Sequence, residues 1–461
     1  MDGAKVHSSG DGRSKCREMD VLDRDRPASR IFVGSSLTEI SGLLDSYPAV
    51  FAVYDRNAGD RIADFNNFVS AAGIRSMYPL AATEDTKTIE TVVDICRWLL
   101  ENGADRDALL LGIGGGIITD IAGFAASIYK RGIRFAYVPT TLLAQVDASI
   151  GGKTGVNMSC YKNMLGTIRQ PDFTWICPEV LSALSYRDFL SGAAEMLKTF
   201  IISDNGDYVS AVSYFKSLYK ALRDENISAA GDCAIVMERG HCLDADKCVG
   251  RDGSPACRQK KDIRGDGSIY TVDEDENSAD ETERQNRFSA FVEGNLRQLG
   301  DLVAAAAAVK ADIVSQDQFE TGCRRMLNLG HTFAHAMEWY VHSRQGDADE
   351  TGGNISCLRA QCSRLAMSHG AAVSVGIILA TRLSEAVGVA PAGLAGKLRA
   401  DFMACGLPVD CPFPLRELAG AMARDKKADG GKIHFILIRS IGETMEYDMT
   451  AEEAVAFLAG E

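Results

Sequence analysis

Residues 139–157 read Pro-Thr-Thr-Leu-Leu-Ala-Gln-Val-Asp-Ala-Ser-Ile-Gly-Gly-Lys-Thr-Gly-Val-Asn, and Lys162-Asn-Met follows shortly after them. The run from Phe135 to Leu143 is mostly apolar and predicts the end of a buried strand. Beyond it the chain brings together one acid, two lysines, two asparagines and a Gly-Gly pair, and glycines let a ligand approach the backbone closely. Such a cluster just past a strand indicates a pocket for a small, heavily oxygenated anion.

Short apolar strands alternate with helical segments in the first half of the chain. We predict strands at Ile31–Val33, Ala49–Asp55, Ala108–Gly114 and Arg134–Val138, and a helix over Ile117–Tyr129. This alternation is typical of a parallel α/β sheet, in which ligands bind at the carboxyl ends of the strands.

After about residue 185 the apolar residues recur with helical periodicity. The predicted helices are Glu195–Ile202, Tyr208–Leu222, Leu296–Ser315, His331–Tyr340, Gly370–Val387 and Leu394–Ala404. We therefore divide the chain into a disordered polar tail (1–30), an α/β domain (31–185) and an α-helical domain (186–461). Two stretches rich in Gly and charged residues, 226–293 and 342–362, are predicted to be surface insertions in the helical domain.

Composition narrows the classes of function. The 461-residue chain carries a net charge of −14, which argues against a general nucleic-acid or membrane-surface role, because either would favour a basic face. No apolar run approaches the roughly 20 residues needed to cross a bilayer. The 13 scattered cysteines and the polar N-terminal segment favour free thiols in a reducing compartment, so we expect a cytoplasmic protein.

A glycine turn connects the predicted strand at Ala108–Gly114 to the helix that follows. Gly112-Ile-Gly-Gly-Gly-Ile-Ile-Thr-Asp120 would direct backbone N–H groups at phosphate oxygens, although the third glycine is misplaced for the strict dinucleotide fingerprint. Asp55, at the end of an earlier strand, suits a pair of ribose hydroxyls. The pattern is equally compatible with a tight strand–helix turn that binds nothing.

Three histidines and one acid have the composition of a catalytic metal site. His331 and His335 are four residues apart and share one helix face, and His369 begins another helix. Glu195 is an acid on an otherwise apolar helix face. Such a set can bind a divalent metal and leave a position open for substrate oxygens. Any one of these histidines taken alone is better explained as a core or capping residue.

Basic residues flank these candidate ligands in sequence. Lys198 follows Glu195 by three residues, and Arg324 precedes His331 at helical-turn spacing. A lone Lys or Arg is usually a solvated surface residue, but arginine forks near a metal site can grip carboxylate or phosphate. The other members of this cation set are Lys310, Arg325, Lys426 and Lys427.

These motifs together resemble those of the 3-dehydroquinate synthase family, in the same order, from about residue 50 to residue 440 outside the two insertions. The motifs are Gly114-Gly-Gly-Ile-Ile-Thr-Asp120, Arg131-Gly, Pro139-Thr-Thr-Leu-Leu-Ala-Gln-Val-Asp147, Gly151-Gly-Lys-Thr-Gly-Val-Asn157, Lys162-Asn-Met, Ala194-Glu-Met-Leu-Lys198, Leu327-Asn-Leu-Gly-His-Thr-Phe-Ala-His335, His369-Gly and Asp425-Lys-Lys427.

The resemblance implies a Rossmann-like α/β NAD-binding domain followed by an all-α metal-binding domain. It implies conversion of 3-deoxy-D-arabino-heptulosonate 7-phosphate into 3-dehydroquinate and phosphate, in the shikimate pathway, by a homodimer that uses NAD and one Zn²⁺ or Co²⁺ ion. The ligands of that ion would be Glu195, His331 and His369, with His335 beside the substrate but not a ligand.

The resemblance also implies three further groups of site residues. Those holding the substrate's carboxylate, hydroxyls and metal-bound oxygens would be Asp147, Lys153, Asn163, Lys198, Lys310, Arg324 and Asn328. Those gripping its phosphate would be Arg131, which would reach from a neighbouring subunit, Lys162, and Lys426 or Lys427. Those lining the NAD site would be Asp55, Asn57, Glu84, Lys87, Gly115, Gly116, Asp120, Thr140 and Thr141.

The chain departs from the family pattern where the family often has Glu after His-Gly, because here that residue is Ala371. The change would loosen the support of His369. The alternatives are another sugar-phosphate cyclase that closes a different ring, a metal-dependent polyol dehydrogenase of related fold, and a non-catalytic scaffold. The set of Lys310, Arg324 and Asn328 favours the dehydroquinate enzyme, because its substrate carries a carboxylate.

Overall fold

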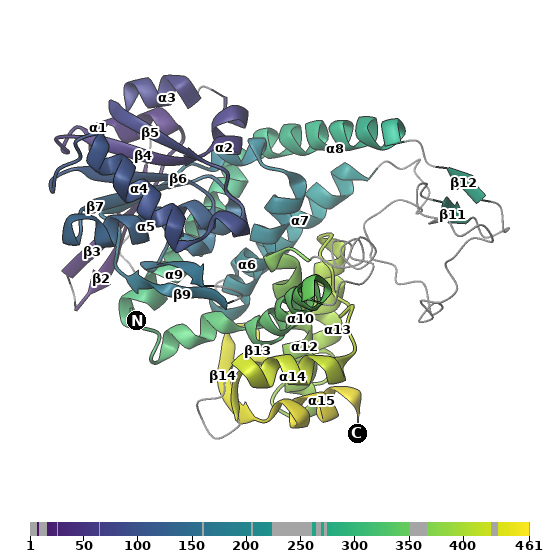
Figure 1. The fold of residues 1–461 in the computed structure, drawn as a ribbon. Helices are drawn as coiled ribbons and strands as arrows, with labels where there is room; N and C mark the ends of the chain where they lie inside the picture. Colours follow the sequence, from purple (N-terminus) through teal and green to yellow (C-terminus); the bar gives the residue numbers. More distant parts are fainter. Residues whose placement is uncertain are drawn as a thin grey trace.

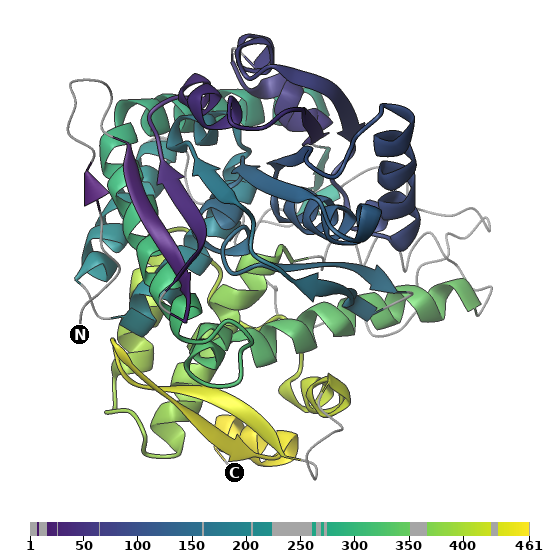
Figure 2. The same ribbon diagram turned by 90° about the vertical axis from the view of Figure 1, so that its left-hand side faces the viewer.

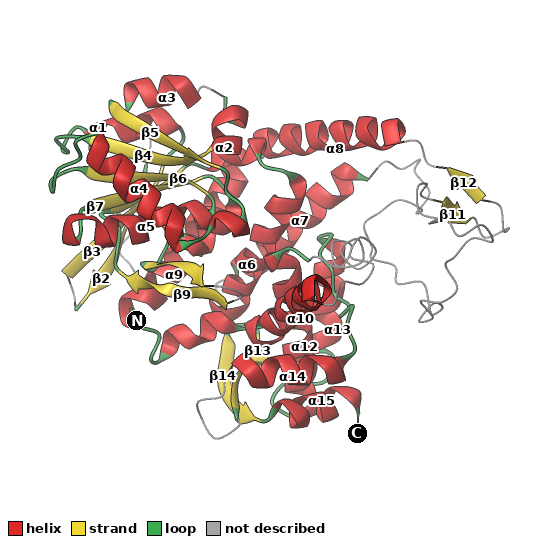
Figure 3. Ribbon diagram, in the orientation of Figure 1, coloured by secondary structure: helices red, strands yellow, loops and turns green. Residues whose placement is uncertain are grey.

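An eight-stranded, mostly parallel sheet forms the N-terminal half of the molecule (Figures 1 and 3). The computed structural model describes residues 7–8, 16–24, 26–63, 65–158, 161–203, 206–223, 261–263, 269–271, 274–350, 367–425 and 432–460. The strand order is β1-β2-β3-β10-β7-β6-β4-β5. The six strands β3, β10, β7, β6, β4 and β5 are parallel to one another, and β1 and β2 add antiparallel strands at one edge. The strands are β1 (His7–Ser8), β2 (Arg17–Asp23), β3 (Arg26–Val33), β4 (Val50–Asp55), β5 (Ile74–Leu80), β6 (Leu109–Gly114), β7 (Arg134–Pro139) and β10 (Phe173–Ile176).

Helices cover both faces of the sheet, which is why β6 is buried along its whole length. Leu110 packs into one core with helices α4 and α5, and its neighbours Leu109 and Leu111 pack into another with α3. The helices of this half are α1 (Ser41–Leu44), α2 (Arg56–Arg61), α3 (Phe65–Ala71), α4 (Ile89–Glu101) and α5 (Gly116–Ile128). The predicted parallel α/β fold is confirmed.

The prediction of a disordered tail over residues 1–30 is wrong for residues 17–24 and 26–30. β2 and β3 belong to the sheet, and β2 lies against helix α9 of the other half (Figure 2). Met19 and Val21 of β2 are buried, while Glu18 and Asp20, which alternate with them, are not. This alternation is that of a strand with one solvated face, and its charged outer positions made it resemble a disordered segment.

A two-stranded hairpin and a single π-helical turn leave the sheet after β7. The hairpin consists of β8 (Lys153–Met158) and β9 (Tyr161–Ile168), and the π-helical turn spans Ala144–Ala148. The sequence predicted a polar pocket in this region but neither of these elements.

The C-terminal half is helical, and every helix predicted for it is present. It also contains the antiparallel hairpin of β13 (Ile433–Ser440) and β14 (Glu443–Met449), so it is not purely α. The described helices are α6 (Tyr186–Ser203), α7 (Asp207–Leu222), α8 (Glu274–Gly294), α9 (Leu296–Gln316), α10 (His331–Glu350), α12 (His369–Ala386), α13 (Leu394–Ala404), α14 (Leu415–Asp425) and α15 (Ala451–Ala459). None of these helices combines the length and apolar character that crossing a membrane requires.

The insertion predicted at 226–293 ends earlier than expected. Phe288 and Val292 of α8 lie one helical turn apart and are both buried in the core of the helical half. Of the preceding residues, the structure describes two short strands, β11 (Lys261–Ile263) and β12 (Ile269–Thr271). The insertion predicted at 342–362 begins within α10, which continues to Glu350, and residues 351–362 lie outside the described residues.

One of the hydrophobic clusters contains residues from both halves. Val146 and Ile150, from the segment after β7, pack in the same buried cluster as Leu197 of α6, Val314 of α9 and Val373 of α12. Residues 139–150 therefore form the junction at which the carboxyl edge of the sheet meets the helical half.

Candidate active site

The predicted NAD residues line the carboxyl edge of the sheet. Asp55 ends β4 and caps α2, where its Oδ1 accepts a hydrogen bond from Asn57 N at 3.1 Å. Gly115 caps the N-terminus of α5 directly after β6. Thr140 follows β7, and its amide donates to Gly114 O at 3.0 Å. The structure thus brings these residues to neighbouring strand ends, with the N–H groups of α5 available for an anion.

Lys87 connects this edge to the hairpin. Its buried ammonium lies 2.6 Å from Asp120 Oδ2 on α5 and 2.5 Å from Asn163 Oδ1 on β9. Glu84 accepts a hydrogen bond from Asn157 Nδ2 at 2.9 Å. Asn157 in turn accepts from the backbone of Asn163, whose φ of +55° is one that Asn tolerates better than most residues.

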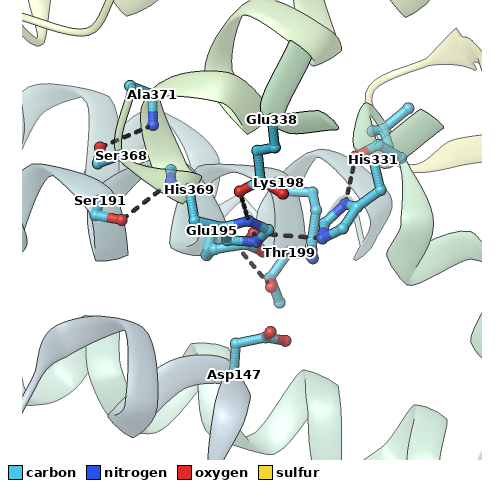
Figure 4. Close-up of polar contacts among 12 residues, drawn as sticks. Asp147, Ser191, Glu195, Lys198, Thr199, His331, Glu338, Ser368, His369 and Ala371 are labelled. Carbon is cyan, nitrogen blue, oxygen red and sulfur yellow. Dashed lines mark hydrogen bonds and ion pairs between the residues drawn. The ribbon is translucent and has the colours of Figure 1, made fainter. Parts of the chain in front are cut away.

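Three helices of the C-terminal half converge on the predicted metal ligands (Figure 4). Glu195 comes from α6, His331 from the start of α10 and His369 from the start of α12, and one ligand atom from each lies within 4.8 Å of the others. Gly370 allows this approach, because a Cβ there would lie 2.1 Å from the carbonyl oxygen of Ser191 on α6. The predicted grouping of these three residues is therefore present.

The carboxylate of Glu195 is completely buried and faces three nitrogen atoms. Lys198 Nζ lies 2.5 Å from Oε2, while His369 Nε2 and His331 Nε2 lie 3.3 Å and 3.6 Å from Oε1. These contacts are close, but neither oxygen has a partner in good hydrogen-bond geometry. Burial alone would raise the pKa of Glu195, but the charge of Lys198 and the nearby His331 lower it well below its usual value.

The donor set suits a divalent metal with nitrogen and oxygen ligands, such as Zn²⁺ or Co²⁺. Burial and the charge of Lys198 lower the pKa of His331 to about 3, so its ring is neutral, as a ligand must be. Burial would lower the pKa of His369, but its contacts with the carboxylates of Glu195 and Glu338 raise it to about 10. With this pKa, the His369 ring carries a proton on both nitrogens at neutral pH. A metal ion bound by Glu195 and His369 would displace one of these protons.

His335 lies beside this group, with its ring centroid 5.5 Å from that of His331 and 6.4 Å from that of His369. In the part of the chain that the structure describes, the set of closely grouped ligand atoms comprises Glu195, His331 and His369 and leaves His335 out. His335 is thus close to the candidate ligands, and its place beside the substrate without a ligand role stays a prediction.

Buried cations lie on the sheet side of the metal ligands. Lys310 of α9 makes an ion pair with the side chain of Asp147 and donates to its carbonyl oxygen at 2.6 Å. Burial lowers the pKa of Lys310 to about 8. Burial would raise the pKa of Asp147, but Lys310 and Lys198 outweigh it, and the carboxyl is ionised. The π-helical turn carries Asp147 into this position, and such turns are frequent at functional sites.

Arg324 is buried against the Gly-Gly pair of the opening motif. A Cβ at Gly151, whose φ is +110°, would lie 2.4 Å from the Arg324 guanidinium. Arg324 also donates to Gln318 O at 2.6 Å. Glycine is thus needed at position 151 both for its backbone conformation and for the close approach of the arginine.

The hairpin presents its lysines to acids of the helical half. Lys153 of β8 makes an ion pair with Glu320, which also accepts a hydrogen bond from Asn328 Nδ2 at 2.6 Å. Lys162 of β9 lies 3.6 Å from Glu338 Oε2 on α10. Both pairs therefore join the two halves of the molecule across the site.

The charged side chains that are buried in the described part of the chain all belong to the predicted site. These residues are Lys87, Glu195, Lys198, Lys310 and Arg324. Burying charges without a functional or pairing reason is costly. Their concentration at one place indicates a site that is built to bind a charged, oxygenated ligand.

Three predicted phosphate residues are not placed in this group. Arg131 lies just after the C-terminus of the thirteen-residue helix α5, at the opposite end from Gly115. It lines a surface hollow with Asp105 and Asp107. The prediction that it acts from a neighbouring subunit stays a prediction. Lys426 and Lys427 lie outside the described residues.

The sequence did not predict two acids that hold site residues, Glu320 and Glu338. Glu320 lies in the loop after α9, where no spacing pattern marks it. Glu338 follows His331 by seven residues, which is two turns of the same helix, and this spacing was the available signal. Asn157 was seen in the polar cluster but was not assigned to the site.

Two family models together match most of the chain. The model described as "3-dehydroquinate synthase N-terminal" matches residues 77–191, and the model for the C-terminal part matches residues 270–348 and 358–428. The 3-dehydroquinate synthase of Rhizobium etli is 32% identical over 399 residues, which are 85% of this chain and 81% of that protein. The enzyme of the same name from Agrobacterium fabrum is 31% identical over 93% of this chain and 91% of its own.

Solved structures of cyclases share the fold. The 2-epi-5-epi-valiolone synthase of Streptomyces hygroscopicus, with NAD⁺ and Zn²⁺ bound, superposes with a TM-score of 0.64 at 22% identity, covering 94% of this chain and 96% of its own. A 2-deoxy-scyllo-inosose synthase complexed with carbaglucose-6-phosphate, NAD⁺ and Co²⁺ superposes with a TM-score of 0.63 at 17% identity, covering 97% of this chain and 99% of its own.

Proposed function

Because the chain belongs to the 3-dehydroquinate synthase family of sugar-phosphate cyclases, we propose that it converts 3-deoxy-D-arabino-heptulosonate 7-phosphate into 3-dehydroquinate and phosphate. The observation that carries the choice of substrate is the buried pair of cations, Lys310 and Arg324, beside Asp147 and the metal ligands. A carboxylate on the substrate would supply the negative charge that Arg324 needs, and Lys310 already has one partner in Asp147.

The cofactors follow from the same residues. Glu195, His331 and His369 would hold one Zn²⁺ or Co²⁺ ion, and the strand ends around Asp55, Gly115 and Thr140 would hold NAD. When bound, the metal would polarise a substrate hydroxyl and NAD would accept and later return a hydride, so that NAD is not consumed.

The chain's own residues would position the substrate and stabilise charge. Asp147 would accept a hydrogen bond from a ring hydroxyl, and Lys310 and Lys153 would donate to neighbouring oxygens. Asn328 and Asn163 would fix the orientation of the sugar, and Lys198 would balance the charge of Glu195. Holding the substrate in a bent conformation lowers the entropic barrier to ring closure, which is an intramolecular step.

Phosphate binding would complete the site. Lys162 on the hairpin and Lys426 or Lys427 would grip the phosphate, with Arg131 of a neighbouring subunit as a further cation. Loss of phosphate needs an acidic proton next to the oxidised carbon, and the departing phosphate's own oxygen can accept that proton without a protein base. Because Arg131 would come from a neighbouring subunit, this phosphate site would require a homodimer.

One assay tests the activity and separates it from the alternatives. The purified protein, with NAD⁺ and Zn²⁺ or Co²⁺, should release inorganic phosphate from the heptulosonate phosphate and form 3-dehydroquinate, with no net accumulation of NADH. Phosphate release with a different carbocycle would make the protein another cyclase. NADH accumulation from a polyol without phosphate release would make it a dehydrogenase, and either result would contradict the proposal.

A further inference from the structure

His369 is held from both sides of its ring. Its Nε2 faces the metal position and lies 3.3 Å from Glu195 Oε1, while its Nδ1 lies 3.1 Å from Glu338 Oε1. Figure 4 shows the Glu338 side chain directed at the His369 ring. An imidazole that binds a metal through Nε2 must carry its proton on Nδ1, and a carboxylate facing Nδ1 fixes that tautomer and the plane of the ring.

The residue that would be expected to support His369 cannot do so. Ala371 has only a methyl side chain, and its amide donates to the hydroxyl of Ser368, which caps α12. Glu338 reaches His369 from another helix, α10, which also supplies His331. Two of the three candidate metal ligands are therefore oriented by one helix, directly for His331 and through Glu338 for His369.

Glu338 has a second partner. Its Oε2 lies 3.6 Å from Lys162 Nζ on β9, and the Glu338 side chain is 12% exposed. One carboxylate thus contacts both a candidate metal ligand and the lysine of the phosphate-binding hairpin. The negative charge of Glu338 is therefore shared between His369 and Lys162. A metal bound at Nε2 of His369 would displace neither contact, because Glu338 faces Nδ1.

We propose that Glu338 is the positioning residue of His369, supplying the support that Ala371 cannot, and that it links the metal site to Lys162. The proposal rests on the metal site proposed above. It assigns Glu338 no contact with substrate or metal.

Cobalt binding tests this inference without any substrate. Metal-free wild-type protein, Glu338→Ala and Glu338→Gln are titrated with Co²⁺, and the dissociation constant and visible absorption spectrum are recorded. Glu338→Ala should bind Co²⁺ about 10–100-fold more weakly, the usual effect of removing a carboxylate behind a ligating histidine, with a changed spectrum. Glu338→Gln should recover part of the affinity, because its amide oxygen can still accept from Nδ1–H.

Glu385→Gln is the matched control. Glu385 lies on α12, the helix that begins with His369, but sixteen residues further along, where it accepts a hydrogen bond from Ala395 N at 2.7 Å. This distance is about 24 Å along the helix, so the variant should bind Co²⁺ as wild type does. Alanine is the best helix former, so Glu338→Ala should fold, which circular dichroism checks.

The outcomes separate the inference from the proposals on which it rests. Wild-type affinity and spectrum in Glu338→Ala would overturn the positioning role alone. A wild-type protein that does not bind Co²⁺ would overturn both the metal site and the role of Glu338. Absence of dehydroquinate from the activity assay, with the cobalt results as expected, would overturn only the choice of substrate.

Discussion

The helices under the site and the hairpin beside it hold their charges in different ways. On α6 and α9, the side chains of Glu195, Lys198 and Lys310 are at most 7% exposed and pair within the helical half or with Asp147. On the β8–β9 hairpin, the side chains of Lys153 and Lys162 are 53% and 39% exposed and pair with acids that come from the opposite half.

This difference separates a preformed part of the site from an adjustable one. A buried charge cannot lose its partner without a large cost, so the arrangement around Glu195 is set when the chain folds. An exposed ion pair is worth little and exchanges readily with solvent. A substrate phosphate or hydroxyl can therefore replace Glu320 or Glu338 as the partner of a hairpin lysine, but nothing can cheaply replace Glu195.

The largest effect is expected from Glu195→Ala. The variant should retain no stoichiometric metal, measured by elemental analysis, and should have no cyclase activity. It should also lose about 3–5 kcal/mol of folding free energy, because Lys198 is left buried without its partner. Full metal content in this variant would remove Glu195 from the ligand set.

A second variant shows whether the loss of stability has this cause. In the double variant with Lys198→Met, no unpaired charge is buried, so the double variant should be more stable than Glu195→Ala in denaturant unfolding. Strictly additive effects of the two changes would contradict the pairing.

A smaller effect, with a pH dependence, is expected at Lys310. Because burial lowers its pKa to about 8, its positive charge is lost above that pH, and kcat/KM should fall there. Lys310→Arg stays charged, so the fall should move to higher pH. At pH 7, Lys310→Met should raise the activation free energy that corresponds to kcat/KM by about 1.5–3 kcal/mol, the value of a hydrogen bond to a charged group. The variant's kcat/KM should fall accordingly.

Stability should move in the opposite direction to activity at this residue. The pKa of Lys310 is below its ordinary value of 10.5, so between pH 8 and 10.5 the unfolded chain holds a proton that the folded protein has lost. The contribution of Lys310 to stability therefore rises across this window. Wild type should gain in unfolding free energy relative to Lys310→Met as the pH is raised, and an unchanged difference would contradict the shifted pKa.

Within the preformed part of the site, the pair Glu195–Lys198 was more predictable from the sequence than the ion pairs of the hairpin. Glu195 and Lys198 share one helical turn, and a charged pair on an apolar helix face is conspicuous in the sequence. The partners of Lys153 and Lys162 are 167 and 176 positions away along the chain, so only tertiary packing brings them together. Sequence spacing carries no information about such pairs.

The fold follows the same division. The mainly apolar strands β4 and β6 and the helices with clear periodicity were found, whereas β2 and the hairpin were not. β2 has alternate charged residues on a solvated face, and β8 has one glycine and three polar residues among its six, so neither has the apolar character of a buried strand. The π-helical turn at Asp147 has no sequence signature that we could use.

The smallest effect is expected at the pair Lys153–Glu320, and it tests the adjustable part directly. A double-mutant cycle with Lys153→Met and Glu320→Gln should give a coupling free energy of about 0.2–1 kcal/mol in the absence of substrate, as for other exposed pairs. The pair Arg439–Glu443 on β13 and β14 is the control: its cation is exposed about as much as Lys153 (51% against 53%), but its acid is more exposed than Glu320 (58% against 20%), so its coupling should lie at the low end of the same range. A coupling of several kcal/mol at Lys153–Glu320 alone would mean that the hairpin is locked to the helical half, and that Glu320 is not a partner which substrate can replace.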